Sequence, residues 1–203
     1  MLITAAEERK KGMTALYIDG EYAVSVDTVT LASMGFGTGS EISDEELYEL
    51  LEKSKLNRAK EKALYLIEYR SRTKKEIYDK LLPLYGENAA QGAVDRLEEL
   101  GLINDERFAR DYAEQLITRK FYSRERAAFE LFKKGINREL AEEVLDEFEM
   151  SPEDQIRSLL ETKFARRLSN EKDRAKTVNS LRNMGFRWQD IRDIMSEFDD
   201  YDE

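Results

Sequence analysis

Lysines and arginines gather in three short stretches of this sequence, and they are the residues whose spacing best suits a chemical task. Residues 53–75 hold nine basic residues against two acidic ones, residues 119–138 hold seven against two, and residues 157–182 hold eight against three. Closely spaced cations bind phosphates and carboxylates on other macromolecules. The pattern therefore favours recognition of a long polyanion or of a groove with acidic walls.

Catalytic chemistry has little support, because the sequence contains no cysteine and no histidine. Thiol nucleophiles, thiolate and imidazole metal ligands, and the side chain best suited to proton transfer near neutral pH are all missing. The glycine cluster from Gly35 to Gly39 trails a predicted helix, and no Gly-Lys-Ser/Thr follows it, so it does not match a phosphate-binding loop. We expect no enzymatic activity, no cofactor and no metal.

Composition is typical of a globular protein that needs no disulfide or metal for its core. The 203 residues are 41% hydrophobic, and the net charge is −10. No stretch approaches the roughly 20 apolar residues of a membrane span, and the N-terminus has no signal-peptide pattern. We expect a cytoplasmic monomer that does not associate with membranes.

The acidic residues are placed apart from the basic ones. Residues 139–154 carry eight acidic residues and no basic one, and residues 193–203 carry six. Mixed charge on helices is often only solvated surface, since a single ion pair one helical turn apart contributes about 0.2–0.5 kcal/mol. Three basic clusters in register favour a binding surface instead.

The N-terminal part differs from the rest of the chain. Apolar residues alternate on both sides of Asp19-Gly20, which predicts a β-hairpin, with Leu2 to Glu8 as a third strand. Asp27 can cap a short helix that ends near Met34. We expect a small β-rich domain over residues 1–42, followed by a linker helix over residues 43–54 that opens with a capping box at Ser43.

From residue 55 onward the sequence is helical and repeats every 50 residues. Leu81, Leu131 and Leu181 are in register, and so are Val94, Val144 and Ile194. Self-similarity at this period is typical of stacked supersecondary units. The predicted repeats cover residues 55–102, 103–149 and 150–203, the last with an acidic tail.

Each repeat is expected to contain three helices. In the second repeat they span residues 105–119, 123–134 and 138–148, and in the third residues 152–168, 171–184 and 188–198. Asn137 and Ser151 can cap helices, and Gly135 and Gly185 can end the middle ones. The predicted fold is mainly α: three tandem three-helix repeats in an elongated, curved stack behind a small N-terminal domain that contains a β-hairpin.

Equivalent positions of stacked repeats line one surface, so the basic clusters are expected to form a stripe. The candidate partner-binding residues lie at the repeated joint between the first and second helices. They are Arg70, Arg72, Lys74, Lys75, Arg119, Lys120, Arg124, Arg126, Arg166, Arg167, Lys172 and Arg174.

One segment resembles a known family. Residues 101–112, Gly-Leu-Ile-Asn-Asp-Glu-Arg-Phe-Ala-Arg-Asp-Tyr, followed by Lys133-Lys134-Gly135-Ile136, resemble the most recognisable stretch of the RecX family of RecA-recombinase regulators. Residues 69–77 resemble the opening repeat of that family, and the β-rich region resembles an extension seen in some members. We expect the motif residues to serve packing, because recognisable motifs of repeat proteins usually do.

The resemblance implies a partner and a role. It implies that the protein binds the RecA–DNA filament in its helical groove and inhibits ATP hydrolysis, filament extension and strand exchange, as part of homologous recombination, DNA repair and the SOS response. DNA would be contacted as part of the filament. Two alternatives remain open: a helical-repeat protein that binds DNA directly, and a scaffold for another protein.

Overall fold

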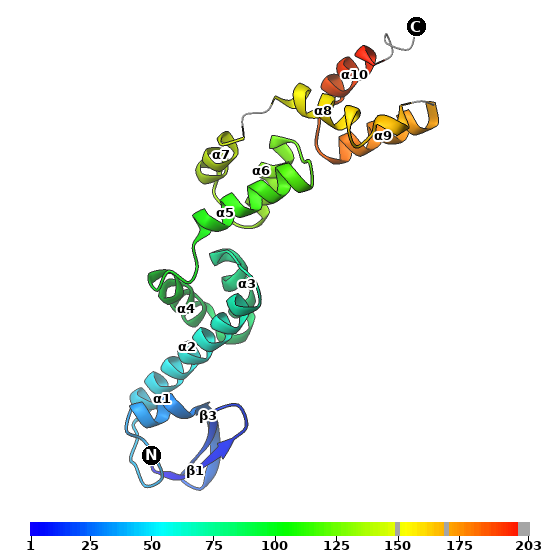
Figure 1. Ribbon diagram of the computed structural model, residues 1–203. Helices are drawn as coiled ribbons and strands as arrows, with labels where there is room; N and C mark the ends of the chain where they lie inside the picture. The colour runs from blue at the N-terminus through cyan, green and yellow to red at the C-terminus, as the bar shows by residue number, and fades with distance from the viewer. Residues whose placement is uncertain (149–150, 169–170, 199–203) are drawn as a thin grey trace. The chain divides into compact units, whose positions relative to one another are not determined.

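The computed structural model describes residues 1–148, 151–168 and 171–198 (Figure 1). The chain divides into two compact units, Met1–Asn104 and Asp105–Glu203. The first unit holds the β-rich region and one three-helix repeat, and the second holds two repeats. Within the described ranges, no helix is both long enough and apolar enough to cross a lipid bilayer.

The N-terminal sheet has three antiparallel strands in chain order: β1 (Ile3–Arg9), β2 (Met13–Ile18) and β3 (Glu21–Asp27). Asp19 and Gly20 join β2 to β3 with φ angles of 51° and 93°. These left-handed values are those of a two-residue type I′ turn, whose twist matches that of paired strands. The predicted hairpin and its additional strand are confirmed.

Asp27 fastens the sheet to the helices that follow it. Its carboxylate is buried and accepts hydrogen bonds from the backbone N–H and the hydroxyl of Thr30, each at 2.8 Å, which caps α1 (Thr28–Ser33). The same oxygen accepts a bond of 2.8 Å from the Asn57 amide, and the Asp27 N–H donates to the Ser54 hydroxyl at 2.7 Å. One buried residue therefore connects β3, α1 and the next helix.

That next helix, α2, is continuous from Asp44 to Tyr69. The predicted capping box is present, with the Ser43 side chain accepting from the Glu46 N–H and the Glu46 carboxylate accepting from the Ser43 N–H. The predicted boundary between the linker helix and the first repeat, at residue 55, lies inside α2. Leu50 of α2 packs in the core of the sheet, whereas Ala63 and Leu66 pack in the core of the first repeat.

Each repeat is built from three helices around its own core. The first repeat combines the C-terminal part of α2 with α3 (Lys74–Tyr85) and α4 (Glu87–Glu99). The second combines α5 (Asp105–Glu114), the π-helical turn η1 (Gln115–Arg119), α6 (Arg124–Lys133) and α7 (Arg138–Asp146). The third combines α8 (Pro152–Glu161), the 3₁₀ turn η2 (Ala165–Arg167), α9 (Glu171–Asn183) and α10 (Trp188–Glu197).

The 50-residue period is confirmed by burial. Leu81, Leu131 and Leu181 are each 0% exposed, and they lie in three separate apolar cores. The predicted caps at Asn137 and Ser151 are observed, and Gly135 and Gly185 have the left-handed φ angles expected after the middle helices. The mainly α fold of three tandem repeats is therefore confirmed.

Two helices differ from the sequence-based expectation. The predicted helix over residues 105–119 becomes a π-helical turn for its last five residues. The predicted helix over residues 152–168 stops at Glu161, and the Thr162 hydroxyl donates back to the Ser158 carbonyl at 2.6 Å. The break lets Phe164 turn into the core, where it is 2% exposed, and such burial outweighs the bonds of one further helical turn.

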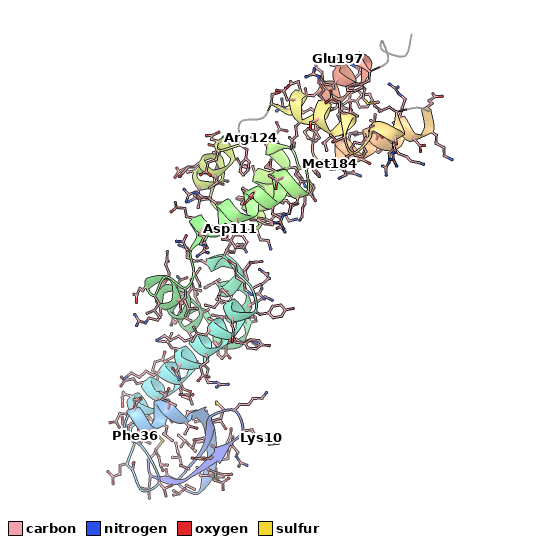
Figure 2. The ribbon with its side chains drawn as sticks, viewed as in Figure 1. Lys10, Phe36, Asp111, Arg124, Met184 and Glu197 are labelled. Carbon is pink, nitrogen blue, oxygen red and sulfur yellow. The ribbon has the colours of Figure 1, made fainter. Side chains whose placement is uncertain are left out.

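The second and third repeats are joined by backbone contacts inside the second unit. The Ser123 N–H, at the start of α6, donates at 2.9 Å to the carbonyl of Met184, which is labelled in Figure 2. The Ser123 hydroxyl donates to the Gly185 carbonyl at 2.9 Å. Glu125 forms an ion pair with Arg187. The turn after α9 thus lies directly on the N-terminus of α6.

Candidate macromolecule-binding surface

Three of the predicted binding residues occupy the same place in their repeats, and each forms contacts inside its own repeat. Lys74, Arg124 and Arg174 are 50 residues apart, in the first turn of each middle helix. Lys74 forms an ion pair of 2.8 Å with Glu98 at the end of α4. In the first repeat, this position therefore links the middle helix to the third one.

Arg124, which is labelled in Figure 2, forms the same link in the second repeat. Its guanidinium donates to the Asp146 carboxylate at 2.6 Å and to the Glu142 carbonyl at 3.3 Å, both on α7. In the third repeat, Arg174 donates to the Met195 carbonyl of α10 at 3.5 Å. Cations placed near the C-terminal carbonyls of a helix are favourable, because those carbonyls carry the negative end of the helix dipole.

The other candidates of the first repeat are also engaged. Arg70 holds Glu76 through two hydrogen bonds of 3.0 Å, and this bonding raises the pKa of Arg70. The Arg72 Nε donates to the Leu66 carbonyl at 3.0 Å, and Lys75 pairs with Asp79. The joint of the first repeat is therefore largely neutralised by neighbouring acceptors.

The second repeat presents its cations differently. Arg119 ends η1 with an exposed side chain, and no hydrogen bond or ion pair joins it to any described residue. Lys120 lies over two aromatic rings, with its Nζ 5.9 Å from the Tyr112 centroid and 5.7 Å from the Tyr122 centroid. Arg126 lies over Tyr122 at 5.5 Å and forms an ion pair of 2.9 Å with Glu130. The candidate cations of this repeat therefore contact aromatic rings more often than carboxylates.

In the third repeat, the candidates divide between the 3₁₀ turn and α9. Arg166 and Arg167 are exposed in η2, and Arg167 lies 5.5 Å from the Phe164 ring. Lys172 is exposed in the first turn of α9. Among the described residues, Arg166 and Lys172 have no ion-pair or hydrogen-bond partner.

The acidic third helices explain why so many cations bind internally. Glu147 follows α7 and accepts from Arg110 of α5 at 3.0 Å, while Glu197 of α10 accepts from Arg157 of α8 at 2.8 Å. Hydrogen bonding to these carboxylates raises the pKa of both arginines. The charge polarity of the sequence thus serves helix pairing inside the second and third repeats.

Sequence reasoning missed part of the basic surface of the second repeat. Lys133 and Lys134 lie in the basic stretch and in the family motif but are not among the candidate residues, and neither is Phe129. In the structure Phe129 is 54% exposed, and the Lys133 Nζ lies 5.5 Å from its ring. The alternation of aromatic and basic residues between Lys120 and Lys134 was the available signal.

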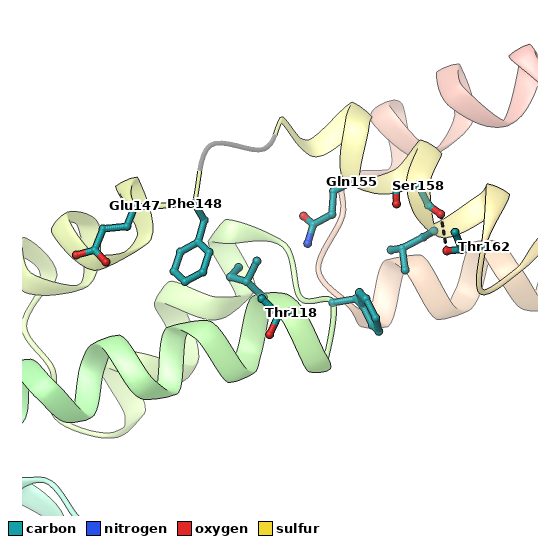
Figure 3. Close-up of a pocket in the computed structure, with 9 residues that line it drawn as sticks. Thr118, Glu147, Phe148, Gln155, Ser158 and Thr162 are labelled. Atoms are coloured by element: carbon teal, nitrogen blue, oxygen red, sulfur yellow. Dashed lines mark hydrogen bonds between the residues drawn. The ribbon is translucent and has the colours of Figure 1, made fainter.

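A pocket of about 380 Å³ lies between the second and third repeats (Figure 3). Gln155 of α8 lines it and donates to the Tyr122 carbonyl at 3.2 Å, and Phe121 lines it while packing on the core of the third repeat. Among the described residues, the lining holds one ionisable side chain, Glu147. Since acid–base or nucleophilic catalysis needs at least a second group within reach, this lining has the chemistry of a packing gap.

The described residues also hold no cluster of three or more acidic, cysteine or histidine side chains arranged for a metal ion. The amides of the glycine cluster are used internally: the Gly39 N–H donates to the Ile3 carbonyl at 2.8 Å, and the Gly37 N–H donates to the Ser40 hydroxyl at 3.0 Å. These donors do not form the open cradle that a phosphate requires.

Comparison with protein families finds two matches along the helical repeats. Residues 59–97 match the first three-helix domain of RecX, and residues 104–145 match the second three-helix domain of RecX. The two matched segments lie within the first and second repeats of the structure.

Among individual proteins, a regulatory protein RecX of Caldanaerobacter subterraneus subsp. tengcongensis is 34% identical over 148 residues, which cover 72% of this chain and 75% of that protein. The regulatory protein RecX of Clostridium tetani is 29% identical over 197 residues, covering 94% of this chain and 90% of that protein. The similarity therefore includes the β-rich region.

Solved structures share the fold. A crystal structure of regulatory protein RecX has a TM-score of 0.63 at 23% identity and covers 95% of this chain and 98% of that one. The crystal structure of RecX from Lactobacillus salivarius has a TM-score of 0.57 at 27% identity and covers 71% of this chain and 97% of that one. The β-rich region and the helical repeats are thus arranged along the chain as in known proteins.

Proposed function

This chain belongs to the RecX family, and from that premise we propose that it is a non-catalytic regulator of the RecA–DNA filament. It binds in the helical groove of the filament and inhibits its ATPase, its extension and its strand exchange. Its partner is the recombinase, with DNA contacted as part of the filament. Its place of action is the cytoplasm.

The observation that carries this proposal is the extent of the family similarity. Two relatives that are named regulatory proteins match 72% and 94% of the chain, and the longer match includes both the β-rich region and the helical repeats. An activity confined to one repeat would not require similarity of that extent. The proposal therefore assigns the function to the whole chain.

The construction of the repeats supports binding to a periodic partner. Each repeat has its own apolar core, so its surface can contact one protomer without depending on a core shared with its neighbours. Several modest contacts along one chain raise the overall affinity, because every contact after the first is intramolecular.

The candidate cations divide into two groups under this proposal. Lys74, Arg124 and Arg174 stabilise the repeats, since they bind the ends of third helices. Arg119, Arg166 and Lys172 are exposed and have no described partner, so they are the best placed to meet acidic recombinase side chains or DNA phosphates. Exposed charges of this kind chiefly raise association rates and make binding depend on salt.

Co-sedimentation with preformed RecA filaments on single-stranded DNA tests this assignment. The variant that combines Arg119→Glu, Arg166→Glu and Lys172→Glu should sediment less with filaments than the wild type, and the deficit should shrink as salt is raised. A matched variant, Lys10→Glu with Lys80→Glu and Arg182→Glu, changes the net charge equally at exposed sites outside the candidate set. Equal loss of co-sedimentation in both variants would show that the effect depends on net charge alone. The assigned residues would then not belong to the binding surface.

A further inference from the structure

An unbroken series of aromatic rings and cations crosses the second repeat. The Phe108 and Tyr112 rings lie 5.6 Å apart, and Lys120 lies between Tyr112 and Tyr122, within 6 Å of each centroid. The series continues from Tyr122 to Arg126 at 5.5 Å and from Arg126 to the Phe129 ring at 5.8 Å. Lys133 covers Phe129 and Lys134 covers Tyr112, which completes the surface that we call the ring–cation surface.

The far end of the ring–cation surface is open to solvent. Phe129 is 54% exposed, and Lys120 and Lys133 are exposed. Glu130 lies among these cations and pairs with Arg126 at 2.9 Å and with Lys133 at 3.3 Å. One carboxylate cannot neutralise both partners, so the surface keeps a net positive charge.

Arg126 is only partly satisfied within the protein. Its Nη2 forms an ion pair of 2.9 Å with Glu130, but its Nε is buried and has no hydrogen-bond partner among the described residues. A buried donor without a partner is uncommon in folded proteins, and it indicates a side chain whose bonding can be completed by another group. The Arg126 side chain is 40% exposed, so an external anion can approach its guanidinium.

The ring–cation surface is particular to the second repeat. A shift of 50 residues places Glu76 and Asp79 in the first repeat where the second has Arg126 and Phe129, and it places Lys176 and Asn179 there in the third. The feature is therefore not a product of the repeat itself. It needs an explanation of its own.

The backbone before α6 is shaped to present this surface. The π-helical turn η1 widens the end of the first helix, and Phe121 follows with a φ angle of 58°. The equivalent residues of the first repeat, up to Tyr69, are ordinary α-helix. π-helical turns and left-handed non-glycine residues cost energy and cluster at functional sites. Here they set the positions of Lys120 and Tyr122 beside Tyr112.

We propose that the ring–cation surface binds single-stranded nucleic acid directly, with a base stacked on Phe129 and phosphates held by Lys120, Arg126 and Lys133. Alternating rings and cations match a single strand, in which every base is followed by a phosphate. An acidic polypeptide would need the cations but would gain nothing from an exposed ring. A duplex would offer no free base face.

This activity goes beyond filament regulation and does not depend on it, because the strand is bound without the recombinase. The test measures fluorescence anisotropy of a labelled oligothymidine, with an abasic strand of the same length and polyglutamate as competitors. No recombinase is present, so the result is separate from the outcome of the filament experiment.

Phe129→Ala is the informative variant, since an exposed side chain can be removed without opening the core. We expect it to weaken oligothymidine binding by about 5- to 100-fold, the range that one stacked base provides. Phe129→Tyr should restore binding. Phe132→Ala is the matched control: Phe132 is 68% exposed on the same helix, and no cation lies over its ring among the described residues.

Each outcome decides the proposal. It is supported if the wild type prefers oligothymidine to the abasic strand and if that preference is lost in Phe129→Ala but kept in Phe132→Ala. It is overturned if the wild type does not bind oligothymidine at low salt, if the two strands bind equally, or if Phe129→Ala binds like the wild type. Competition by polyglutamate as strong as by oligothymidine would also overturn it, in favour of an acidic protein partner.

Discussion

Gly185 packs closely against the start of α6, so Gly185→Ala should loosen the junction between the second and third repeats. Gly185 has a φ angle of 97°, and a methyl group built there would lie 2.5 Å from the Arg126 Cβ and 2.7 Å from the Ser123 Oγ. A carbon at 2.5 Å from another carbon is not tolerated, so either the turn or the start of α6 must move.

The magnitude follows from two contributions. Placing alanine in a left-handed conformation costs about 1–2 kcal/mol. Relieving the overlap costs a further 1–3 kcal/mol or so, either as strain or through loss of the two hydrogen bonds from Ser123 to the turn. Gly101→Ala is the control, because Gly101 has a φ angle of 68° but nothing within 4 Å of the added methyl group. It should show the first contribution alone.

The assay is amide hydrogen exchange at Ser123, supported by thermal unfolding. In the wild type, the Ser123 N–H donates to the Met184 carbonyl of the next repeat, and this bond should protect it. Gly185→Ala should lower that protection, whereas Gly101→Ala should leave it unchanged. If protection at Ser123 survived in Gly185→Ala and both variants were equally destabilised, the described junction would not hold the repeats together.

Four further variants test the roles assigned to three charged residues and to one core leucine. Asp27→Ala should lower the free energy of unfolding of the first unit by about 2 kcal/mol or more in urea titrations, because a buried helix cap and a link to α2 are lost together. A loss below about 0.5 kcal/mol would contradict this role of Asp27. Arg124→Ala should lower stability by at most about 1 kcal/mol, because its ion pair with Asp146 is exposed, while Arg119→Ala should leave stability unchanged and weaken filament binding. Equal stability loss in both would show that Arg124 has no special link to α7. Leu131→Ala should lower the free energy of unfolding by about 2–5 kcal/mol in chemical denaturation, because it leaves a cavity in a core where Leu131 is fully buried. A loss below about 1 kcal/mol would contradict this packing.

Much of the fold follows from local chemistry that the sequence displays. The turn at Asp19-Gly20, the cap at Ser43 and the stop at Gly185 each depend on residues within one turn of each other. The period of 50 residues is likewise visible, because every core needs a leucine at the same place in its middle helix. Local preference and tertiary structure agree at these positions, so the sequence predicts them.

Other features depend on contacts between distant residues and could not be predicted. The π-helical turn before Lys120 and the helix break at Thr162 place Phe121 and Phe164 in the core of the third repeat. Whether a cation binds a third helix or faces solvent depends on which carboxylate the fold brings near it: Arg124 finds Asp146, and Arg119 finds no described partner. Spacing alone treats these two arginines alike.

The steady-state ATPase rate of RecA on single-stranded DNA, measured while this protein is titrated, tests the central claim most directly. Filament regulation predicts inhibition at protein concentrations far below those needed to bind the same DNA alone. Phe129→Ala should still inhibit if the recombinase is the main partner. Inhibition that appears only where bare DNA is occupied, or no inhibition at all, would contradict the proposed function.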